Sequence, residues 1–197
     1  MLSKNQHLAI INNQIAKCSA CQLAYTRNRV VVGEGNAESS LMIIGEAPGA
    51  TEDKKGIPFC GKSGEFLNTV LEENNLNRDK VFITNIVKCR PPRNEYPSDE
   101  SIKACLSNFV LQRKCIKPTM FICLGNLAFR TLAGNNDLLI SRNRGTLIRV
   151  GQYIIAPLWH PAYVVRYEHE RETFRQDFKR AIDYYATYIN NTHNLIL

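Results

Sequence analysis

Hydrophobic residues along the chain form short continuous runs that alternate with segments of helical spacing. The apolar runs at 41–44, 81–86 and 120–125 have the length and composition of buried strands. The segment 145–156 is expected to form a hairpin whose second arm joins the same sheet. Strands that alternate with helices favour a mainly parallel sheet with helices on both faces. We therefore expect one domain over residues 1–197, an α/β fold with a central, mainly parallel four-stranded sheet.

The segments between these strands have apolar residues on one helical face. Ser3 can cap a first helix that ends near Lys17, and Ser98 can cap the helix that carries Cys105. Further helices are expected after a Gly-rich loop, after the third strand and near the C-terminus, before a short tail of mixed polarity. The apolar faces consist of Leu8, Ile11 and Ile15; Phe66, Leu67, Val70 and Leu71; Ala128 and Leu132; and Phe174, Phe178, Ala181, Ile182 and Tyr185.

Polar loops follow three of the predicted strands. The first carries Glu46, Glu52 and Asp53, the second begins at Asn85, and the third contains His160. Open α/β sheets bind their ligands outside the carboxyl ends of the strands, so we expect these loops to form one site. The amide of Asn85 can donate and accept, which suits a base edge, and His160 is a candidate acid or donor to a developing anion.

Composition and charge restrict the class of protein. The 197 residues are 44% hydrophobic and 22% charged, which is ordinary for a globular protein, and no apolar run approaches the roughly 20 residues of a membrane span. The N-terminal sequence lacks the features of a signal peptide, so we expect a cytoplasmic, nucleoid-associated protein with no membrane partner. The net charge of +7 and the pI near 9.1 favour a polyanionic partner, with Arg166 in the most basic region as a candidate DNA contact.

Seven cysteines are many for a chain expected in a reducing compartment. Cys18 and Cys21 form a C-x2-C pair, and Cys89 and Cys105 form a second pair with wider spacing. Four thiolates can hold zinc or an iron–sulfur cluster, and the spacing leaves the metal open. No such pattern includes Cys60, Cys115 and Cys123, and the last is expected to be a buried, inert thiol.

The segment 56–63 matches the phosphate-loop pattern G-x4-G-K-[ST]. That pattern requires a strand immediately before it, whereas residues 52–55 are polar, and Pro58 removes one amide that would contact phosphate. We therefore reject a nucleotide triphosphatase. A Gly-rich helix start still suits a DNA phosphate, which makes Lys62 and Ser63 candidate DNA contacts.

Taken in order, these motifs resemble the family 4 uracil-DNA glycosylases, the iron–sulfur group of the uracil-DNA glycosylase superfamily. The similarity extends from about Cys18 to Tyr185, and the combination of motifs is more specific than any one of them. The matching segments are Gly45–Gly49 with Glu52 and Asp53, Gly56–Gly64, Ile83–Pro92 and His160–Tyr163.

The resemblance implies a three-layer α/β/α sandwich with a [4Fe–4S] cluster that ties the N-terminal helix to the loop after the second strand. It also implies a uracil pocket formed by Glu46 and Ala47 through backbone groups and by Phe59, Asn85 and His160. The cluster ligands would be Cys18, Cys21, Cys89 and Cys105.

The implied reaction is hydrolysis of the glycosidic bond of a uracil that has been flipped out of DNA. Phe59 would stack on the base, Asn85 would donate to O4 and accept from N3–H, and His160 would stabilise the leaving anion near O2. Glu52 would close the wall beside C5 against the methyl group of thymine. Ala47 stands where the best-known branch of the superfamily has a water-positioning Asp, so the water could be held by Glu46 or by backbone groups.

The expected function is a monofunctional glycosylase that starts base excision repair, because no lysine is well placed as a nucleophile for strand cleavage. The alternative is a non-catalytic DNA-binding module of the same fold with an iron–sulfur or zinc site. Covalent trapping of the sugar is not expected, because residues 93–97 lack a basic, His-bearing insertion. The expected partner is uracil-containing DNA, single- or double-stranded, bound by a monomer.

Overall fold

The computed structural model describes residues 1–193 and contains one mixed sheet of six strands. Four parallel strands form its centre, and a short antiparallel strand borders each edge, in the order β1-β3-β2-β4-β6-β5. The central strands are β2 (Leu41–Gly45), β3 (Phe82–Asn85), β4 (Met120–Leu124) and β6 (Tyr153–Leu158); the edge strands are β1 (Glu34–Gly35) and β5 (Ile148–Val150).

The predicted parallel centre is confirmed, but the predicted number of four strands is wrong. The first arm of the expected hairpin, β5, also joins the sheet, where it pairs with β6. The other added strand, β1, has two residues and no apolar alternation, and it pairs with β3 through Glu34 and Gly35. A strand of two residues is too short to show a hydrophobic period, so its sequence does not predict it. Only its hydrogen bonds to β3 define it as a strand.

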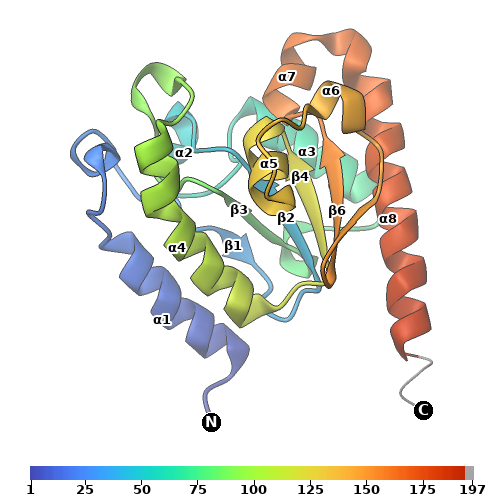
Figure 1. The fold of residues 1–197 in the computed structure, drawn as a ribbon, viewed down its shortest axis with the longest axis horizontal. Coiled ribbons are helices and arrows are strands. Elements are labelled where there is room, and N and C mark those ends of the chain that lie inside the picture. Colours follow the sequence, from blue (N-terminus) through green and yellow to red (C-terminus); the bar gives the residue numbers. More distant parts are fainter. Residues whose placement is uncertain (194–197) are drawn as a thin grey trace.

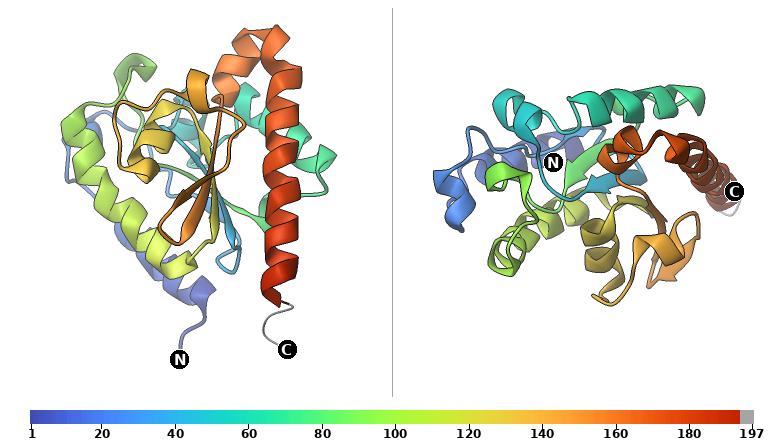
Figure 2. Two further views of the ribbon diagram at one scale, coloured as in Figure 1. Left: turned by 45° about the vertical axis from the view of Figure 1, so that its right-hand side comes forward. Right: turned by 90° about the horizontal axis from the view of Figure 1, so that it is seen from above.

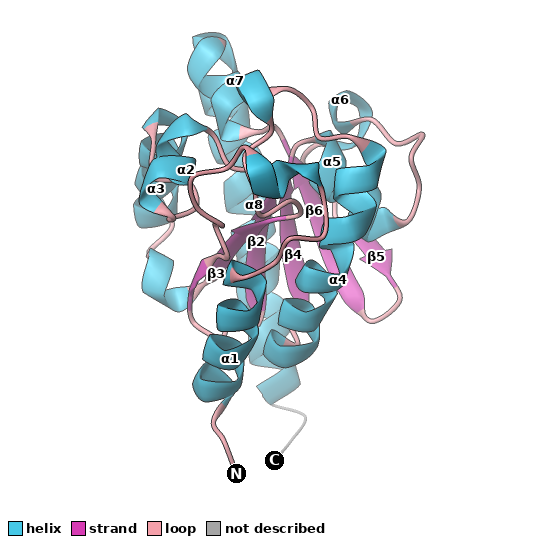
Figure 3. Ribbon diagram, turned by 90° about the vertical axis from the view of Figure 1, so that its left-hand side faces the viewer, coloured by secondary structure: helices cyan, strands magenta, loops and turns pink. Residues whose placement is uncertain are grey.

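Helices cover both faces of the sheet, which confirms the predicted three layers (Figures 1 and 2). The side chains of β2 alternate between the two layers, with Met42 and Ile44 on one face and Leu41 and Ile43 on the other. Figure 3 shows α1 and α4 in front of the strands and α8 behind them. The first layer contains α1 (Lys4–Ala16), α4 (Asp99–Ile116), α5 (Asn126–Ala133) and α6 (Ile140–Asn143); the second contains α3 (Lys62–Glu73), α7 (Pro161–Arg166) and α8 (Arg171–His193).

The predicted helix caps are present. The Ser3 hydroxyl accepts from the Gln6 amide at 3.2 Å, and the Gln6 side chain accepts from the Ser3 amide at 2.8 Å, which forms a capping box. At the start of α4, the Ser98 hydroxyl accepts from the Ser101 amide at 3.2 Å. These local bonds fix where α1 and α4 begin, so Cys105 lies inside α4 as expected.

A helix, and not a strand, precedes the Gly-rich loop, which argues against the phosphate-loop alternative. Residues before this loop form α2 (Ala50–Lys55), which ends at Gly56 with φ of 77°. The segment is therefore helix–loop–helix rather than strand–loop–helix, in agreement with the rejection made from the sequence.

Short 3-10 helices connect the longer elements. Near the C-terminus one of them separates α7 from α8, where the sequence predicted a single last helix. The short helices are η1 (Gln22–Tyr25), η2 (Arg78–Lys80), η3 (Pro92–Asn94) and η4 (Glu168–Glu170). The last four residues of the expected C-terminal tail lie outside the described residues. Within the described part of the chain, no helix has the length and apolar character needed to cross a membrane.

Candidate active site

The register of the parallel strands brings their carboxyl ends to one edge. Gly45 pairs with Asn85, and Leu124 pairs with Leu158, so the loops that follow these strands start at similar heights. They surround a cavity of about 430 Å³. Its lining consists of Glu46, Ala47, Pro48, Gly49, Glu52, Phe59, Ser63, Asn85, Pro91, Asn94, Glu95, His160, Ala162, Tyr163 and Arg166.

All residues proposed from the sequence to contact the base line this cavity, as do two of the three proposed DNA contacts, Ser63 and Arg166. Lys62 does not line it and is exposed at the first position of α3. Their roles in recognition remain predictions.

Phe59 forms one wall of the cavity and is 4% exposed. Its ring stacks near that of His160, with centroids 5.6 Å apart and planes at 28°. Its backbone has φ of 49°, a left-handed conformation that costs energy for a residue with a side chain. A Cβ on Gly64 would lie 1.7 Å from the Phe59 carbonyl oxygen, so only glycine lets α3 start this close to the loop.

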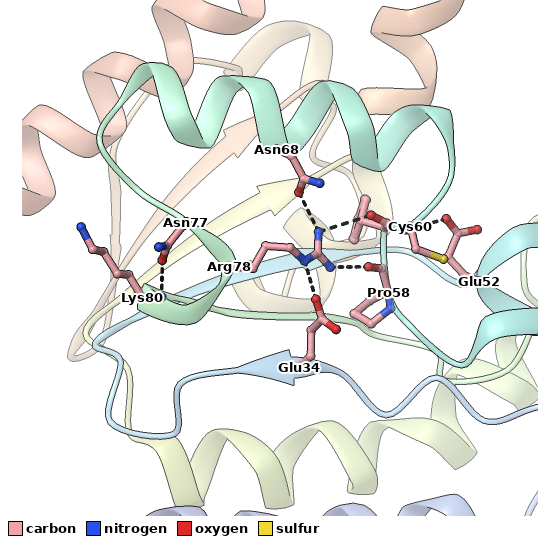
Figure 4. Close-up of polar contacts among 9 residues, drawn as sticks. Glu34, Glu52, Pro58, Cys60, Asn68, Asn77, Arg78 and Lys80 are labelled. Carbon is pink, nitrogen blue, oxygen red and sulfur yellow. Dashed lines mark hydrogen bonds and ion pairs between the residues drawn. The ribbon is translucent and has the colours of Figure 1, made fainter.

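Arg78 holds the Phe59 loop from outside the cavity (Figure 4). Its guanidinium donates to the carbonyl oxygens of Pro58 at 2.5 Å and of Phe59 at 3.3 Å. The same group donates to Asn68 in α3 at 2.9 Å and forms an ion pair with Glu34 of β1. One planar side chain therefore joins three elements to the loop and stabilises its strained conformation.

Glu52 holds the same loop from α2, and it is drawn beside Cys60 in Figure 4. One carboxylate oxygen accepts from the amide of Cys60 at 3.1 Å and from that of Gly61 at 2.9 Å. Its neighbour Asp53 faces another segment and accepts from the Asn28 amide at 2.9 Å. Glu52 is therefore both part of the cavity wall and a support for the Phe59 loop.

Asn85 is the least exposed polar side chain in the lining of the cavity. It is 2% exposed, and its Oδ1 atom is buried without a hydrogen-bond partner in the protein. A buried acceptor without a donor is costly, so this geometry fits an oxygen that a ligand donor completes. A Cβ on Gly45 would lie 2.4 Å from this oxygen and 2.5 Å from the Phe59 ring, so the glycine keeps the space open.

His160 caps α7, and its Nδ1 atom accepts from the Ala162 amide at 3.1 Å. The proton of the neutral ring is therefore on Nε2. Part of the ring opens onto the cavity, yet desolvation by the surrounding protein lowers its pKa to about 4, against the opposing charge of Glu52. The neutral ring is thus a hydrogen-bond donor at physiological pH.

Glu46 follows directly after β2 and is half-buried. Desolvation raises the pKa of its carboxyl group, which brings it closer to the range of a general base. Its backbone carbonyl accepts from the Val87 amide at 2.9 Å, which ties the first loop to the segment after β3.

The four cysteines of the two predicted pairs line a second, small cavity. They come from the segment before η1, the loop after β3, and α4. Three donors reach their sulfur atoms: Arg27 Nη1 lies 3.2 Å from Cys89, the Lys88 amide 3.3 Å from Cys105, and Asn108 Nδ2 3.6 Å from Cys18.

Hydrogen bonds to sulfur are typical of iron–sulfur sites, so this donor set fits a cluster. Burial raises the pKa of the Cys89 thiol to about 11, against the effect of Arg27, so a bound metal must displace its proton. In the part of the chain that the structure describes, no three Cys, His, Asp or Glu side chains have the spacing of a site for a single ion.

The other cysteines lie outside this cavity. Cys123 is buried in β4, where burial raises its pKa, as expected for an inert core thiol. Cys60 and Cys115 are partly exposed, and the Cys115 thiol contacts the Lys4 carbonyl oxygen at 3.7 Å.

Several residues around the two cavities were not found by sequence reasoning. Pro91, Asn94 and Glu95 line the first cavity from the turn that begins with the paired prolines, and Asn94 has φ of 58°. An Asn after Pro-Pro is a turn signal that could have indicated this. No local sequence pattern marks Arg78 or Lys88 as a residue that supports the site.

The cavity at the sheet edge thus brings together an aromatic ring, a buried amide oxygen without a partner and a neutral histidine, an arrangement that suits a planar heterocycle. Comparison with known proteins specifies the class. The sequence profile of the Uracil DNA glycosylase superfamily matches residues 32–185. A type-4 uracil-DNA glycosylase of Thermotoga maritima is 36% identical over 167 residues, which cover 84% of this chain and 87% of that protein.

A type-4 uracil-DNA glycosylase of Archaeoglobus fulgidus is 37% identical over 178 residues, which cover 86% of this chain and 89% of that protein. A type-5 enzyme of Thermus thermophilus is 30% identical over 125 residues, covering 56% of this chain and 57% of that protein. The chain belongs to the uracil-DNA glycosylase superfamily and, within it, to the type-4 group.

Proposed function

We propose that this chain is a monofunctional uracil-DNA glycosylase that acts as one domain over residues 1–197. The observation that carries the proposal is the unpartnered Oδ1 atom of Asn85, buried beside the Phe59 ring and facing the same cavity as His160. Membership of the type-4 group supports the same substrate, since its curated members have this activity by name.

Uracil supplies the donor that Asn85 lacks. Its N3–H points toward an acceptor, and its O4 accepts from the Asn85 amide group, whereas cytosine presents the opposite pattern at both positions. Phe59 stacks on the flipped base and offsets part of the cost of unstacking, on the order of 1–3 kcal/mol. Glu52, in the cavity wall, faces C5 and excludes the methyl group of thymine.

The reaction breaks the bond between the sugar C1′ and uracil N1. The electron pair leaves with the base, whose negative charge spreads to O2, and the Nε2–H of His160 donates to that oxygen. A water oxygen then bonds to C1′ and loses a proton. The Glu46 carboxylate, with its raised pKa, is the candidate acceptor of that proton, and a water held by backbone groups is the alternative.

Basic and hydroxyl side chains at the cavity are the proposed contacts with DNA. Arg166 and Ser63 lie in its lining, and Lys62 is exposed beside it, so all three can contact phosphates on either side of the flipped nucleotide. We propose a monomer that binds single- or double-stranded DNA in the nucleoid.

The cysteine cavity holds a [4Fe–4S] cluster in this proposal, on Cys18, Cys21, Cys89 and Cys105. When bound, the cluster supplies a covalent link between three segments of the chain and no step of the hydrolysis. A cluster fits the donors to sulfur described above, and Arg27 also bonds the Cys18 carbonyl oxygen at 2.6 Å.

The test is incubation of purified protein with a uracil-containing oligonucleotide without divalent metal, followed by hot alkali. We expect strand scission at uracil only after alkali, and a large fall in its rate in Asn85→Ala and His160→Ala. Intact strands after treatment with brown, cluster-loaded protein would contradict the proposal and favour a non-catalytic DNA-binding module.

A further inference from the structure

Lys88 lies between the two cavities and is 1% exposed. Its Nζ atom donates to the Thr84 hydroxyl at 2.6 Å and to the Asn85 carbonyl oxygen at 2.7 Å. The ammonium also lies 5.9 Å from the centre of the Phe109 ring in α4. The side chain of Lys88 thus contacts the backbone of the proposed base reader.

The backbone of Lys88 is part of the second cavity. Its amide donates to the Cys105 sulfur at 3.3 Å, and the next residue along the chain is Cys89. One residue therefore contacts both Asn85 and the proposed cluster ligand Cys105.

The Lys88 amine has no carboxylate partner. In the described part of the chain, no Asp or Glu oxygen lies within ion-pair distance of its Nζ atom. Desolvation by burial lowers the pKa of this amine to about 7. Hydrogen bonds and the contact with the Phe109 ring, rather than an ion pair, therefore fix the position of the side chain.

We propose that Lys88 is a positioning residue that couples the cluster to base recognition: its backbone amide donates to the Cys105 sulfur, and its side-chain amine donates to the Asn85 carbonyl oxygen. This inference rests on the proposed function and on the proposed cluster. It assigns the cluster an effect on the uracil pocket through a single buried side chain, without any electron transfer.

The test compares Lys88→Met, Asn85→Ala and the double variant in single-turnover excision of uracil. We expect Lys88→Met to lower the rate by about 10- to 100-fold, because a small displacement of a reading group has an effect of this size. In the Asn85→Ala background the same change should cost less than about 3-fold, since Lys88 acts through Asn85. Additive losses would overturn the proposal.

A second readout is independent of activity. The side-chain hydrogen bonds of Lys88 hold the backbone whose amide donates to the Cys105 sulfur, and weaker donation to sulfur makes reduction of a cluster harder. The reduction potential of the cluster in Lys88→Met should therefore shift to more negative values. Lys114→Met, which removes an exposed cation from the far end of α4, is the matched control and should leave it unchanged. An unchanged potential in Lys88→Met would also overturn the proposal.

Should Lys88→Met not fold, Thr84→Val removes one acceptor of the Lys88 amine and leaves Lys88 itself in place. Its loss of excision rate should again be non-additive with Asn85→Ala, and additivity would contradict the proposal. Failure of the proposed function is distinguishable, because wild-type protein would then leave uracil-containing strands intact.

Discussion

At the scale of single residues, the space that a missing side chain leaves in the cavity is as important as the polar groups around it. Gly45 has no side chain, and this absence lets Asn85 and Phe59 approach each other at the floor of the cavity. Sequence reasoning identified Asn85 and His160 because each lies at the end of a predicted strand, and Phe59 because its Gly-rich loop resembles that of a known family. It could not identify the reason for Gly45, because that reason is a contact between atoms far apart in the chain.

Gly45→Ala should lower kcat/KM for uracil excision by about 100-fold or more, since its methyl group would displace the Asn85 oxygen or the Phe59 ring. The backbone at Gly45 is an ordinary strand, so the fold should be retained. Steady-state kinetics with a thermal unfolding curve as control checks this. Wild-type kcat/KM in a folded variant would show that the space is not required.

His160 gives a prediction about pH. Its pKa is about 4 in the folded protein and near 6.5 when it is free of these contacts, so the unfolded chain binds more protons between these values. Stability linked to His160 is therefore full above about pH 6.5 and falls as the pH drops toward 4. Urea unfolding at pH 7 and pH 4.5 should show a smaller acid loss in His160→Asn than in wild type, and equal losses would contradict the assignment.

At the scale of elements, the loop that carries Phe59 is held from two sides. Glu52 from α2 bonds its amides, and Arg78 from η2 bonds its carbonyl oxygens. The sequence predicted α3, the loop and its glycines, because helix periodicity and Gly-rich turns are local signals. It did not predict Arg78, whose partners range up to the distant Glu34.

Arg78→Lys keeps the positive charge but loses the planar guanidinium, whose N–H groups bond Pro58, Phe59 and Asn68 at the same time. We expect the kcat/KM for excision to fall about 10-fold, with a larger loss for Arg78→Ala. Arg149→Gln, at an exposed position of β5, is the control for lost positive charge and should remain near wild type. A wild-type value for Arg78→Ala would mean that the loop holds Phe59 without this clamp.

At the scale of the whole molecule, the order and register of the parallel strands determine where both cavities lie. The parallel register brings three loops to one edge, and the chain after β3 passes from Asn85 to Cys89 within four residues. The fold class and the layers were accessible from the sequence, because hydrophobic periodicity encodes them, whereas the set of four cysteines needed the family resemblance beside the C-x2-C spacing. The edge strand β1, the place of β5 in the sheet and the donors around the sulfur atoms were not accessible, because they depend on tertiary pairing.

Cys18→Ser should abolish the absorbance near roughly 400 nm of an iron–sulfur cluster and lower the melting temperature, because a link between three segments is lost. Cys115→Ser is the matched control, since its partly exposed thiol lies outside the cysteine cavity and should affect neither property. Visible absorbance that persists in Cys18→Ser would remove this residue from the ligand set.

The central claim is that the cavity at the ends of β2, β3 and β6 binds uracil through Asn85, Phe59 and His160. A crystal structure of the protein with free uracil tests it most directly. The account predicts N3–H within hydrogen-bond distance of Asn85 Oδ1, the ring stacked on Phe59, and O2 near His160 Nε2. Uracil bound elsewhere, or reversed so that Asn85 Oδ1 still has no donor, would contradict it.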